Sequence, residues 1–295
     1  MFTNSKIRGS QQHLISLSRK EKEMENKLIA LKNEISKLVE GGVCIAFSGG
    51  VDSSLILKLA CEADEKLNKQ IYAVTFETKL HPVSDVTISK KVASEMGAIH
   101  EIIQINEFEN EKILTNPVDR CYQCKKSLFV NLVDFAKNHN LKYVLDGTNA
   151  DDLNAYRPGV KALGELGVIS PLAKLGITKS EVREFARSLN ISVASRPSAP
   201  CMATRLPYNT AINFELLENI EKGEEFIKSL GFKDVRLRVH NDIVRIEVNK
   251  EDLDNILSKR DSVIEYLKNL GFIYITLDLE GFRSGSMDIY VKGDK

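Results

Sequence analysis

Apolar and polar positions change their period several times along this chain. Apolar residues at alternating spacings of three and four predict a helix over residues 19–39, which Gly41 and Gly42 end. The apolar run 43–47 then predicts a buried strand, and a helical pattern follows over 55–67. Because strands and helices continue to alternate, the pattern predicts a doubly wound parallel sheet with helices on both faces. Further strands are expected at 71–76, 100–105 and 142–146, and further helices at 83–96, 128–138 and 179–189.

Local signals indicate where elements and domains begin. Thr178, followed three residues later by Glu181, forms the capping-box pattern and predicts that a helix starts at residue 179. From about residue 207 the pattern changes, and it predicts a small second α/β domain. That domain is expected to hold helices at 213–230 and within 250–270, and strands at 235–240, 243–248 and 272–279. We therefore expect a polar leader (1–18), a first α/β domain (19–206) and a smaller second one (207–295).

Composition excludes several classes of protein. The 295 residues carry 41 Lys plus Arg against 41 Asp plus Glu, and this zero net charge argues against binding to nucleic acid or to an anionic membrane surface. Apolar residues make up 43% and charged residues 28%, as in ordinary globular proteins. The sequence has no apolar run of the ~18 residues that a membrane span needs, and no signal-peptide pattern. We expect a cytoplasmic protein with no nucleic-acid or membrane partner.

A glycine-rich turn, SGGVDSS at 48–54, lies between the first predicted strand and the next helix. Backbone N–H groups and the helix dipole make such a turn an anion site. Gly49 and Gly50 would let the chain approach a phosphate closely, while the hydroxyls of Ser48, Ser53 and Ser54 add donors. The turn is neither a Walker P-loop nor a dinucleotide fingerprint. It resembles the pyrophosphate-binding loop (PP-loop) of the N-type ATP pyrophosphatases, which split ATP into AMP and pyrophosphate; the alternative is a tight turn with capping serines.

The five cysteines are too few for a secreted disulfide framework, and three of them are candidate metal ligands. Cys121 and Cys124 form a CxxC pair, and Cys201 lies in a proline-punctuated loop. Three thiolates can hold three irons of a cubane cluster and leave the fourth iron open, whereas a closed zinc site needs a fourth ligand. A redox dithiol, zinc or inert packing are the alternatives for the CxxC pair. Cys44 and Cys61 are interpreted as small buried apolar residues.

Five segments together resemble the LarE family, the ATP-dependent sulfur transferases of nickel-pincer nucleotide cofactor biosynthesis. The resemblance runs from the helix before the PP-loop almost to the C-terminus, which is far more specific than the loop alone. The segments are GTNADDLNAYRPG (147–159), ELGVISPLAKLGITKSEVR (165–183), RPSAPCMATRLPY (196–208), VRLRVHNDIVRIEV (235–248) and ITLDLEGFRSGSM (275–287).

The resemblance implies a reaction and a sulfur donor. ATP would adenylate a carboxylate of pyridinium-3,5-dicarboxylate mononucleotide, pyrophosphate would leave, and sulfur would displace AMP to give a thiocarboxylate. In sacrificial members of the family, the cysteine that matches Cys201 gives up its own sulfur, and those members lack the CxxC pair. Members with cysteines matching Cys121, Cys124 and Cys201 bind a [4Fe-4S] cluster that carries a hydrosulfide. This chain resembles that branch, so we expect a separate sulfide source and, as is common in the family, a homo-oligomer.

Charged residues near the phosphate groups are further candidates. Mg²⁺ should gather where charge builds on the α-phosphate, and Asp52 of the PP-loop is the candidate for organising metal or ATP. Asp151 and Asp152 are weaker candidates, with helix capping as the alternative. Arg236 and Arg238 match family positions that bind the substrate phosphate, although they also fit a solvated strand face.

Three more residues have two interpretations each. Glu224 and Glu247 match acidic positions of an intersubunit metal site in family hexamers, and the alternative is that they form salt bridges at the surface. Arg205 would hold either its own loop or an anionic substrate. At the level of function, the alternatives are a transfer-RNA thiolase or another thiolating or amidating PP-loop enzyme, and a non-catalytic nucleotide sensor. Zero net charge argues against the thiolase.

Overall fold

The computed structural model describes residues 4–67, 70–106, 111–154, 158–198, 200–283 and 285–288. The chain forms two compact units: Met1–Phe76, Val86–Ile103 and Lys125–Arg196 make the first, and Glu77–Asp85, Gln104–Cys124 and Pro197–Lys295 make the second. The predicted domain boundary lay after residue 206, so the second unit is larger than expected. It takes in two connections of the first half of the chain, because Leu80 and Ile113 of these connections are buried in its core.

The first unit is built on a four-stranded sheet with the strand order β3-β2-β1-β4. In β1, Val43 stands opposite Ile71 of β2 on one side and Tyr143 of β4 on the other, both in parallel register. The chain winds outward from β1 to β3 and then returns to place β4 on the opposite side of β1, so the predicted doubly wound sheet is confirmed. The strands are β1 (Val43–Ala46), β2 (Ile71–Glu77), β3 (Ile99–Gln104) and β4 (Tyr143–Leu145).

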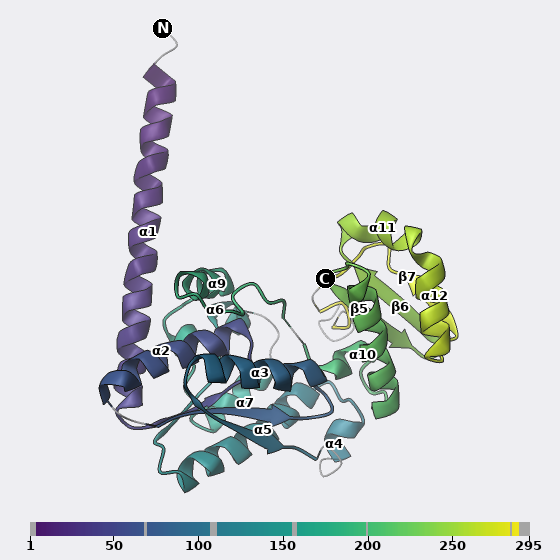
Figure 1. Cartoon of the computed structure of the whole chain (residues 1–295), viewed down its shortest axis with the longest axis horizontal. Coiled ribbons are helices and arrows are strands. Elements are labelled where there is room, and N and C mark those ends of the chain that lie inside the picture. The colour runs from purple at the N-terminus through teal and green to yellow at the C-terminus, as the bar shows by residue number, and fades with distance from the viewer. Residues whose placement is uncertain are drawn as a thin grey trace. The chain divides into compact units, whose positions relative to one another are not determined.

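Helices cover both faces of this sheet, and α5 lies across it from α2 and α3 (Figure 1). The rings of Phe129 and Phe135 in α5 contact Phe76 and Tyr72 of β2, with centroids 6.4 and 5.6 Å apart. The short helices were not predicted, because one or two turns are too few to show a period. The helices before residue 197, of which α4 belongs to the second unit, are α1 (Asn4–Val39), α2 (Val51–Leu67), α3 (Val83–Glu95), α4 (Glu111–Leu114), α5 (Arg120–Asn138), α6 (Ala150–Asn154), α7 (Gly159–Glu165), α8 (Pro171–Lys174) and α9 (Lys179–Ser188).

Helix α1 is longer than the sequence pattern indicated. It begins at Asn4, within the predicted polar leader, rather than at residue 19. The apolar seam shows only the part that packs against the domain, whereas a helix can continue through polar residues of good helix propensity. Leu31 and Ile35 of this seam are fully buried.

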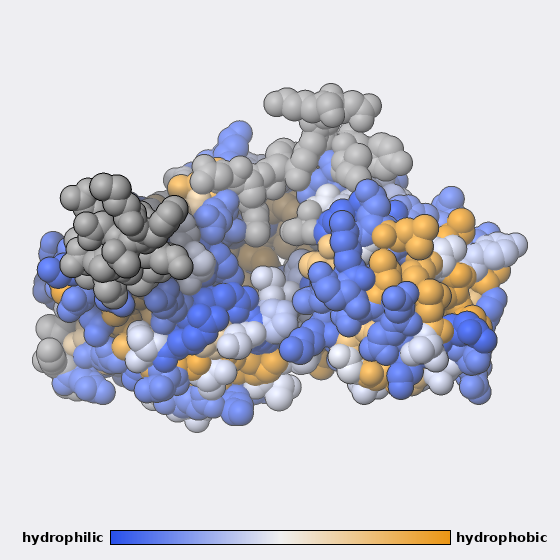
Figure 2. All heavy atoms as spheres, turned by 90° about the horizontal axis from the view of Figure 1, so that it is seen from above, coloured by the Kyte–Doolittle hydropathy of each residue, from blue (hydrophilic) through white to orange (hydrophobic). Residues whose placement is uncertain are grey.

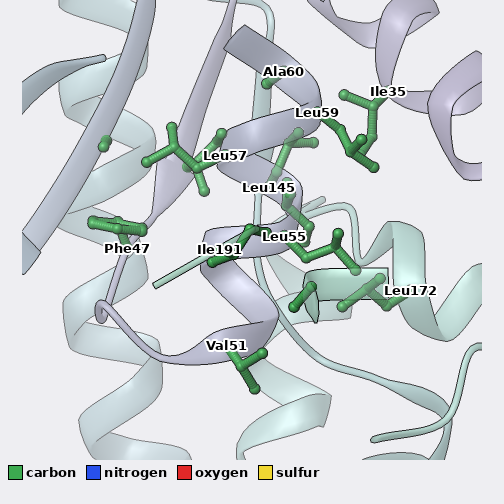
Figure 3. Packing of buried hydrophobic residues seen from close by; sticks show 14 of the residues in the cluster. Ile35, Phe47, Val51, Leu55, Leu57, Leu59, Ala60, Leu145, Leu172 and Ile191 are labelled. Carbon is green, nitrogen blue, oxygen red and sulfur yellow. The ribbon is translucent and has the colours of Figure 1, made fainter. Parts of the chain in front are cut away.

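The core of the first unit lies between α1, α2, the sheet and α8. Ile35 of α1, Leu55 of α2 and Leu145 of β4 belong to one cluster there and have no exposed surface. Figure 3 shows their side chains. Leu172 of α8 closes the same cluster. Burial of this apolar surface fixes the positions of β1 and β4, whose ends carry the candidate site.

The second unit holds a three-stranded sheet of order β5-β6-β7, with β5 and β6 antiparallel and β6 and β7 parallel. This is the expected small α/β domain, and its strands and main helices lie close to their predicted positions. The loop expected at 196–208 contains a short 3₁₀ helix, because Met202 and Ala203 are buried in the core of this unit. The elements are η2 (Met202–Arg205), α10 (Phe214–Ser229), β5 (Val235–His240), β6 (Ile243–Val248), η3 (Lys250–Asp252), α11 (Leu253–Ser258), α12 (Arg260–Asn269) and β7 (Tyr274–Leu277).

Apolar side chains gather on the face of the second unit that Figure 2 views. The exposed large aliphatic residues that the structure describes in this unit are Val83, Ile243, Leu257, Ile264, Ile273 and Leu279. Patches of this kind commonly mark contact surfaces. Within the described ranges, no helix is both long and apolar enough to cross a membrane.

The predicted capping box at the start of α9 is confirmed and gives a stability test. The Thr178 hydroxyl accepts from the Glu181 amide at 3.4 Å, and the Glu181 carboxylate accepts from the Thr178 amide at 2.8 Å. We expect Thr178→Ala to lower the free energy of unfolding by ~1 kcal/mol in urea titrations, whereas Thr178→Ser keeps the acceptor and stays near wild type. Equal losses in both variants would show that the methyl group, and not the cap, contributes the stability.

Candidate active site

The PP-loop lies at the carboxyl ends of β1 and β4, where the connections from the two strands run in opposite directions. In doubly wound sheets this switch point is where ligands bind. The chain that leaves β4 packs directly on the loop, since a Cβ on Gly147 would lie 2.9 Å from the amide nitrogen of Ser53. The fold therefore brings two loops, far apart in sequence, to one crevice of the first unit.

The PP-loop is held in a curled form by its own serines. The Ser48 hydroxyl accepts from the Gly50 amide at 3.3 Å, and the Ser53 hydroxyl donates to the Gly50 carbonyl at 3.2 Å. Gly49 has a φ of +64°, and a Cβ there would lie 3.0 Å from the Ser89 amide nitrogen, so glycine is required. Ser54 is fully buried, and its hydroxyl has no hydrogen-bond partner among the described residues. Ser48 and Ser53 thus shape the loop, while the first-turn N–H groups of α2 lack intrahelical partners and suit an anion.

Asp52 of the PP-loop is engaged by two residues that the sequence reasoning missed. Its carboxylate forms a close ion pair with the Lys179 ammonium and accepts from the Asn149 side-chain amide at 3.1 Å. Lys179 is the first residue of α9, and Asn149 follows β4. The two contacts of Asp52 therefore join three segments of the chain. A signal was present: Lys179 directly follows the capping Thr178 within a segment that resembles the LarE family.

Asp151 and Asp152 lie in the first turn of α6. The Asp151 carboxylate accepts from the backbone N–H of Lys179 at 2.8 Å, and that of Asp152 accepts from the backbone N–H of Asn149 at 3.2 Å. The Asn149 side-chain oxygen accepts from both aspartate amides, at 3.0 and 3.3 Å. These contacts match the capping interpretation, in which the two carboxylates hold the turn beside Asp52.

Two further residues organise the surroundings of the PP-loop. Asp146, buried at the end of β4, accepts from the Thr148 hydroxyl at 2.5 Å, from the Ser170 hydroxyl and from the Lys125 ammonium at 3.4 Å. Arg196 donates to the Gly49 carbonyl at 3.3 Å. With Lys179, Arg196 places a second cation beside the loop amides. The site can therefore hold polyphosphate and stabilise negative charge that develops on it.

The three candidate cysteine ligands all belong to the second unit. Helix α5 starts earlier than predicted, so Cys121 and Cys124 lie three residues apart in its first turn, on one helix face. The Arg120 guanidinium donates to the Cys121 sulfur at 3.5 Å and interacts electrostatically with Cys201. Cys124 and Cys201 both pack against the core of the second unit. Burial raises the pKa of the Cys201 thiol, and the positive charge of Arg120 opposes that rise.

Free soft thiols near a guanidinium are a donor set that suits an iron-sulfur cluster. All five cysteines are free. Among the residues that the structure describes, no three Cys, His, Asp or Glu side chains are arranged to hold a single metal ion. A cubane makes a different demand, because each of its three thiolates binds a different iron.

Cys44 and Cys61 lie outside these sites. Cys44 is fully buried in β1, as expected, and Cys61 is half-buried against the core of the first unit. Burial raises the pKa of Cys44 to about 12 and that of Cys61 to about 11. Both thiols are therefore protonated and unreactive at neutral pH.

The core of the second unit contains buried ion pairs between arginine and glutamate side chains. Arg205 donates to both carboxylate oxygens of Glu224, at 2.9 and 2.8 Å. Burial alone would raise the pKa of Glu224, but the Arg205 guanidinium holds it below its usual range. Glu247 accepts from Arg238 at 3.2 Å and from Arg245 at 3.0 Å. A metal ion at Glu224 and Glu247 would have to compete with these arginines, and it stays a prediction.

Arg236 differs from its neighbour Arg238. The Arg238 guanidinium is paired with Glu247 and donates to the Thr204 carbonyl at 2.8 Å. The buried Arg236 guanidinium donates to two backbone carbonyls, those of Val235 at 2.6 Å and Ser198 at 3.2 Å. Its Nε atom has no hydrogen-bond partner among the described residues. Arg236 therefore retains capacity for an anion.

Comparisons with known proteins agree with this arrangement. A family model described as asparagine synthase matches residues 35–195, a range that contains the PP-loop and Lys179. The pyridinium-3,5-bisthiocarboxylic acid mononucleotide synthase of Lactiplantibacillus plantarum is 36% identical over 246 residues, which cover 83% of this chain and 88% of the relative. An uncharacterized protein of Synechocystis is 35% identical over 267 residues, covering 90% and 98%. One of the subunits of the glutamine-hydrolyzing GMP synthase of Archaeoglobus fulgidus is 28% identical over 221 residues, covering 70% of each chain.

The position of Lys179 predicts a role in ATP binding. We expect Lys179→Met to weaken ATP binding by about 10-fold or more in calorimetric titrations, because a charged hydrogen bond contributes ~1.5–3 kcal/mol. Lys174→Met is the matched control, since this exposed lysine of α8 pairs with Glu34 at 2.6 Å. An affinity of Lys179→Met equal to that of wild type would exclude the role.

Proposed function

Because the chain belongs to the LarE family of PP-loop ATP-dependent sulfur transferases, we propose that it adenylates a carboxylate of pyridinium-3,5-dicarboxylate mononucleotide and replaces AMP with sulfur. The observation that carries the proposal is the ion pair of Asp52 with Lys179 at a PP-loop on the switch point of the sheet. It accounts for ATP activation, while the relative from Lactiplantibacillus plantarum, named as a bisthiocarboxylic acid mononucleotide synthase, supports the acceptor.

In the first step a carboxylate oxygen of the substrate attacks the α-phosphorus of ATP. The bond from that phosphorus to the bridging oxygen breaks, and pyrophosphate leaves with the negative charge. The N–H groups of the PP-loop and the Lys179 ammonium receive that charge, and Asp52 holds Lys179 in place. Mg²⁺, which prefers oxygen ligands and retains waters, would bind chiefly through the phosphates, because Lys179 and Asn149 already occupy the Asp52 carboxylate.

In the second step a sulfur nucleophile attacks the activated acyl carbon. The bond from that carbon to the AMP oxygen breaks, so that AMP and a thiocarboxylate are the products. We propose that Cys121, Cys124 and Cys201 hold a [4Fe-4S] cluster. Such a cluster, when bound, would supply inorganic sulfide from its open iron, which an external sulfide source must replenish. The three thiols must lose their protons to act as ligands. Burial raises the pKa of the Cys201 thiol, and the positive charge of Arg120 opposes that rise.

The phosphate of the substrate would bind at Arg236 rather than at Arg238. Arg236 is buried, and its guanidinium lies 5.2 Å from the ring of Phe282. Burial and the positive charge of the nearby Arg205 lower the pKa of Arg236. A bound anion would offset the repulsion between these two guanidinium groups. Arg238 is already compensated by Glu247. Arg238 would therefore contribute indirectly, by holding β5 against β6 through its ion pair with Glu247. The Arg236 guanidinium is then the one available to phosphate.

Two properties of the protein accompany this function. Free thiols persist in reducing compartments, so five free cysteines support a cytoplasmic enzyme. The exposed aliphatic residues of the second unit support a homo-oligomer, since a second copy would cover them.

The test supplies oxygen-free protein with ATP, Mg²⁺, sulfide and pyridinium-3,5-dicarboxylate mononucleotide. We expect AMP, pyrophosphate and a thiocarboxylate identified by mass spectrometry, with about four irons per chain, the content of one cubane. Cys121→Ala, Cys124→Ala and Cys201→Ala should lose iron and product. Cys61→Ala, a half-buried thiol outside both sites, should retain them.

Other outcomes would change specific parts of the proposal. Iron-free wild type that forms product once per chain and loses the sulfur of Cys201 would exclude the cluster and leave a sacrificial donor. Absence of AMP formation with this acceptor, together with thiolation of transfer RNA, would overturn the proposed substrate.

A further inference from the structure

Arg120 is a deeply buried cation of the cysteine region, with 2% of its surface exposed. It is the first residue of α5, directly before the CxxC pair. Among the described residues it forms no salt bridge with a carboxylate. Burying an unpaired guanidinium is costly, so a counter-charge is expected close by.

The contacts of Arg120 point to sulfur as that counter-charge. Its guanidinium donates to the Cys121 sulfur at 3.5 Å and lies 5.9 Å from the centre of the Tyr208 ring. The other hydrogen bond is to the Asn116 side-chain oxygen, a neutral acceptor. The electrostatic partners of Arg120 include Cys201 as well as Cys121, so two of the three candidate ligands act on the same guanidinium.

We propose that Arg120 is a positioning residue of the cysteine site: it compensates the negative charge of the ligating sulfurs and holds Cys121 by an N–H···S hydrogen bond. The inference rests on the proposed function, because it assumes that these cysteines ligate a cluster. Hydrogen bonds to sulfur and nearby charge set both the affinity for a cluster and its reduction potential. A nearby cation stabilises the more negative, reduced state and so raises the potential.

A purely structural role is the alternative, and Asn116 provides the control for it. The Asn116 side chain accepts from Arg120 and donates to the Pro207 carbonyl at 2.7 Å, so Arg120 also braces two loops of the second unit. Asn116→Ala removes this brace and leaves the guanidinium beside Cys121. Arg120→Gln removes the charge but keeps an N–H donor, and Arg120→Lys keeps the charge without the planar guanidinium.

The experiment reconstitutes full-length protein with iron and sulfide without oxygen and measures iron retention against a chelator and the reduction potential by EPR-monitored titration. For Arg120→Gln we expect iron affinity about 10-fold or more below wild type and a more negative potential in the residual cluster. Arg120→Lys should keep a potential near wild type with an intermediate loss of affinity. Asn116→Ala should match wild type in potential.

The experiment distinguishes a failure of the role of Arg120 from a failure of the cluster proposal. Arg120→Gln with the iron affinity and potential of wild type, or Asn116→Ala with the same shift as Arg120→Gln, would overturn the role of Arg120 and leave the cluster proposal intact. If Arg120→Gln does not fold, Arg120→Lys decides through its reduction potential: because this variant keeps the positive charge, a potential well below that of wild type would show that the charge of Arg120 does not set the potential. Wild type that takes up no iron would overturn both this inference and the cluster.

Discussion

The ion pair between Asp52 and Lys179 is the interaction on which the ATP site depends. It links the first turn of α2 to the first residue of α9, and Asn149, which follows β4, completes the contact. Each of these positions is fixed by burial nearby: Leu55 of α2, Leu145 of β4 and Val182 of α9 share one core. Because packing in the first unit fixes the positions of both partners, the ion pair holds the Lys179 ammonium beside the PP-loop. Because Asp52 is committed to Lys179, we propose that it orients this cation and that the loop amides and the lysine bind the phosphates.

The buried arginines of the second unit fall into two groups, those that pair with a carboxylate and those that do not. Arg205 and Arg238 have carboxylate partners within the sheet and α10, so they stabilise the unit. Arg236 and Arg120 form no salt bridge with a carboxylate among the described residues, and we propose a different anion for each, the substrate phosphate for Arg236 and the cysteine sulfurs for Arg120. Unpaired buried cations are costly to a fold, so their retention is better explained by ligands than by stability.

The order of elements could be predicted from the sequence, because strand and helix periods are local and the core elements are long enough to show them. The PP-loop residues and the capping box at Thr178 were found for the same reason: their chemistry is contained within a few consecutive residues. Lys179 and Asn149 were missed because their roles arise only where three distant segments meet. The larger extent of the second unit was also missed, because Leu80 and Ile113 lie in connections whose patterns do not show which core they join. A salt bridge of Glu224 was among the alternatives, but only tertiary structure could select Arg205 as its partner and show that the pair is buried.

The central claim is that adenylation at the PP-loop is chemically separate from sulfur transfer at the cysteines. Exchange of labelled pyrophosphate into ATP in the presence of pyridinium-3,5-dicarboxylate mononucleotide reports the first step alone. We predict that Cys201→Ala exchanges pyrophosphate as wild type does, only when the carboxylate acceptor is present, while forming no thiocarboxylate. Exchange that is lost in Cys201→Ala, or that proceeds in wild type without the acceptor, would contradict it.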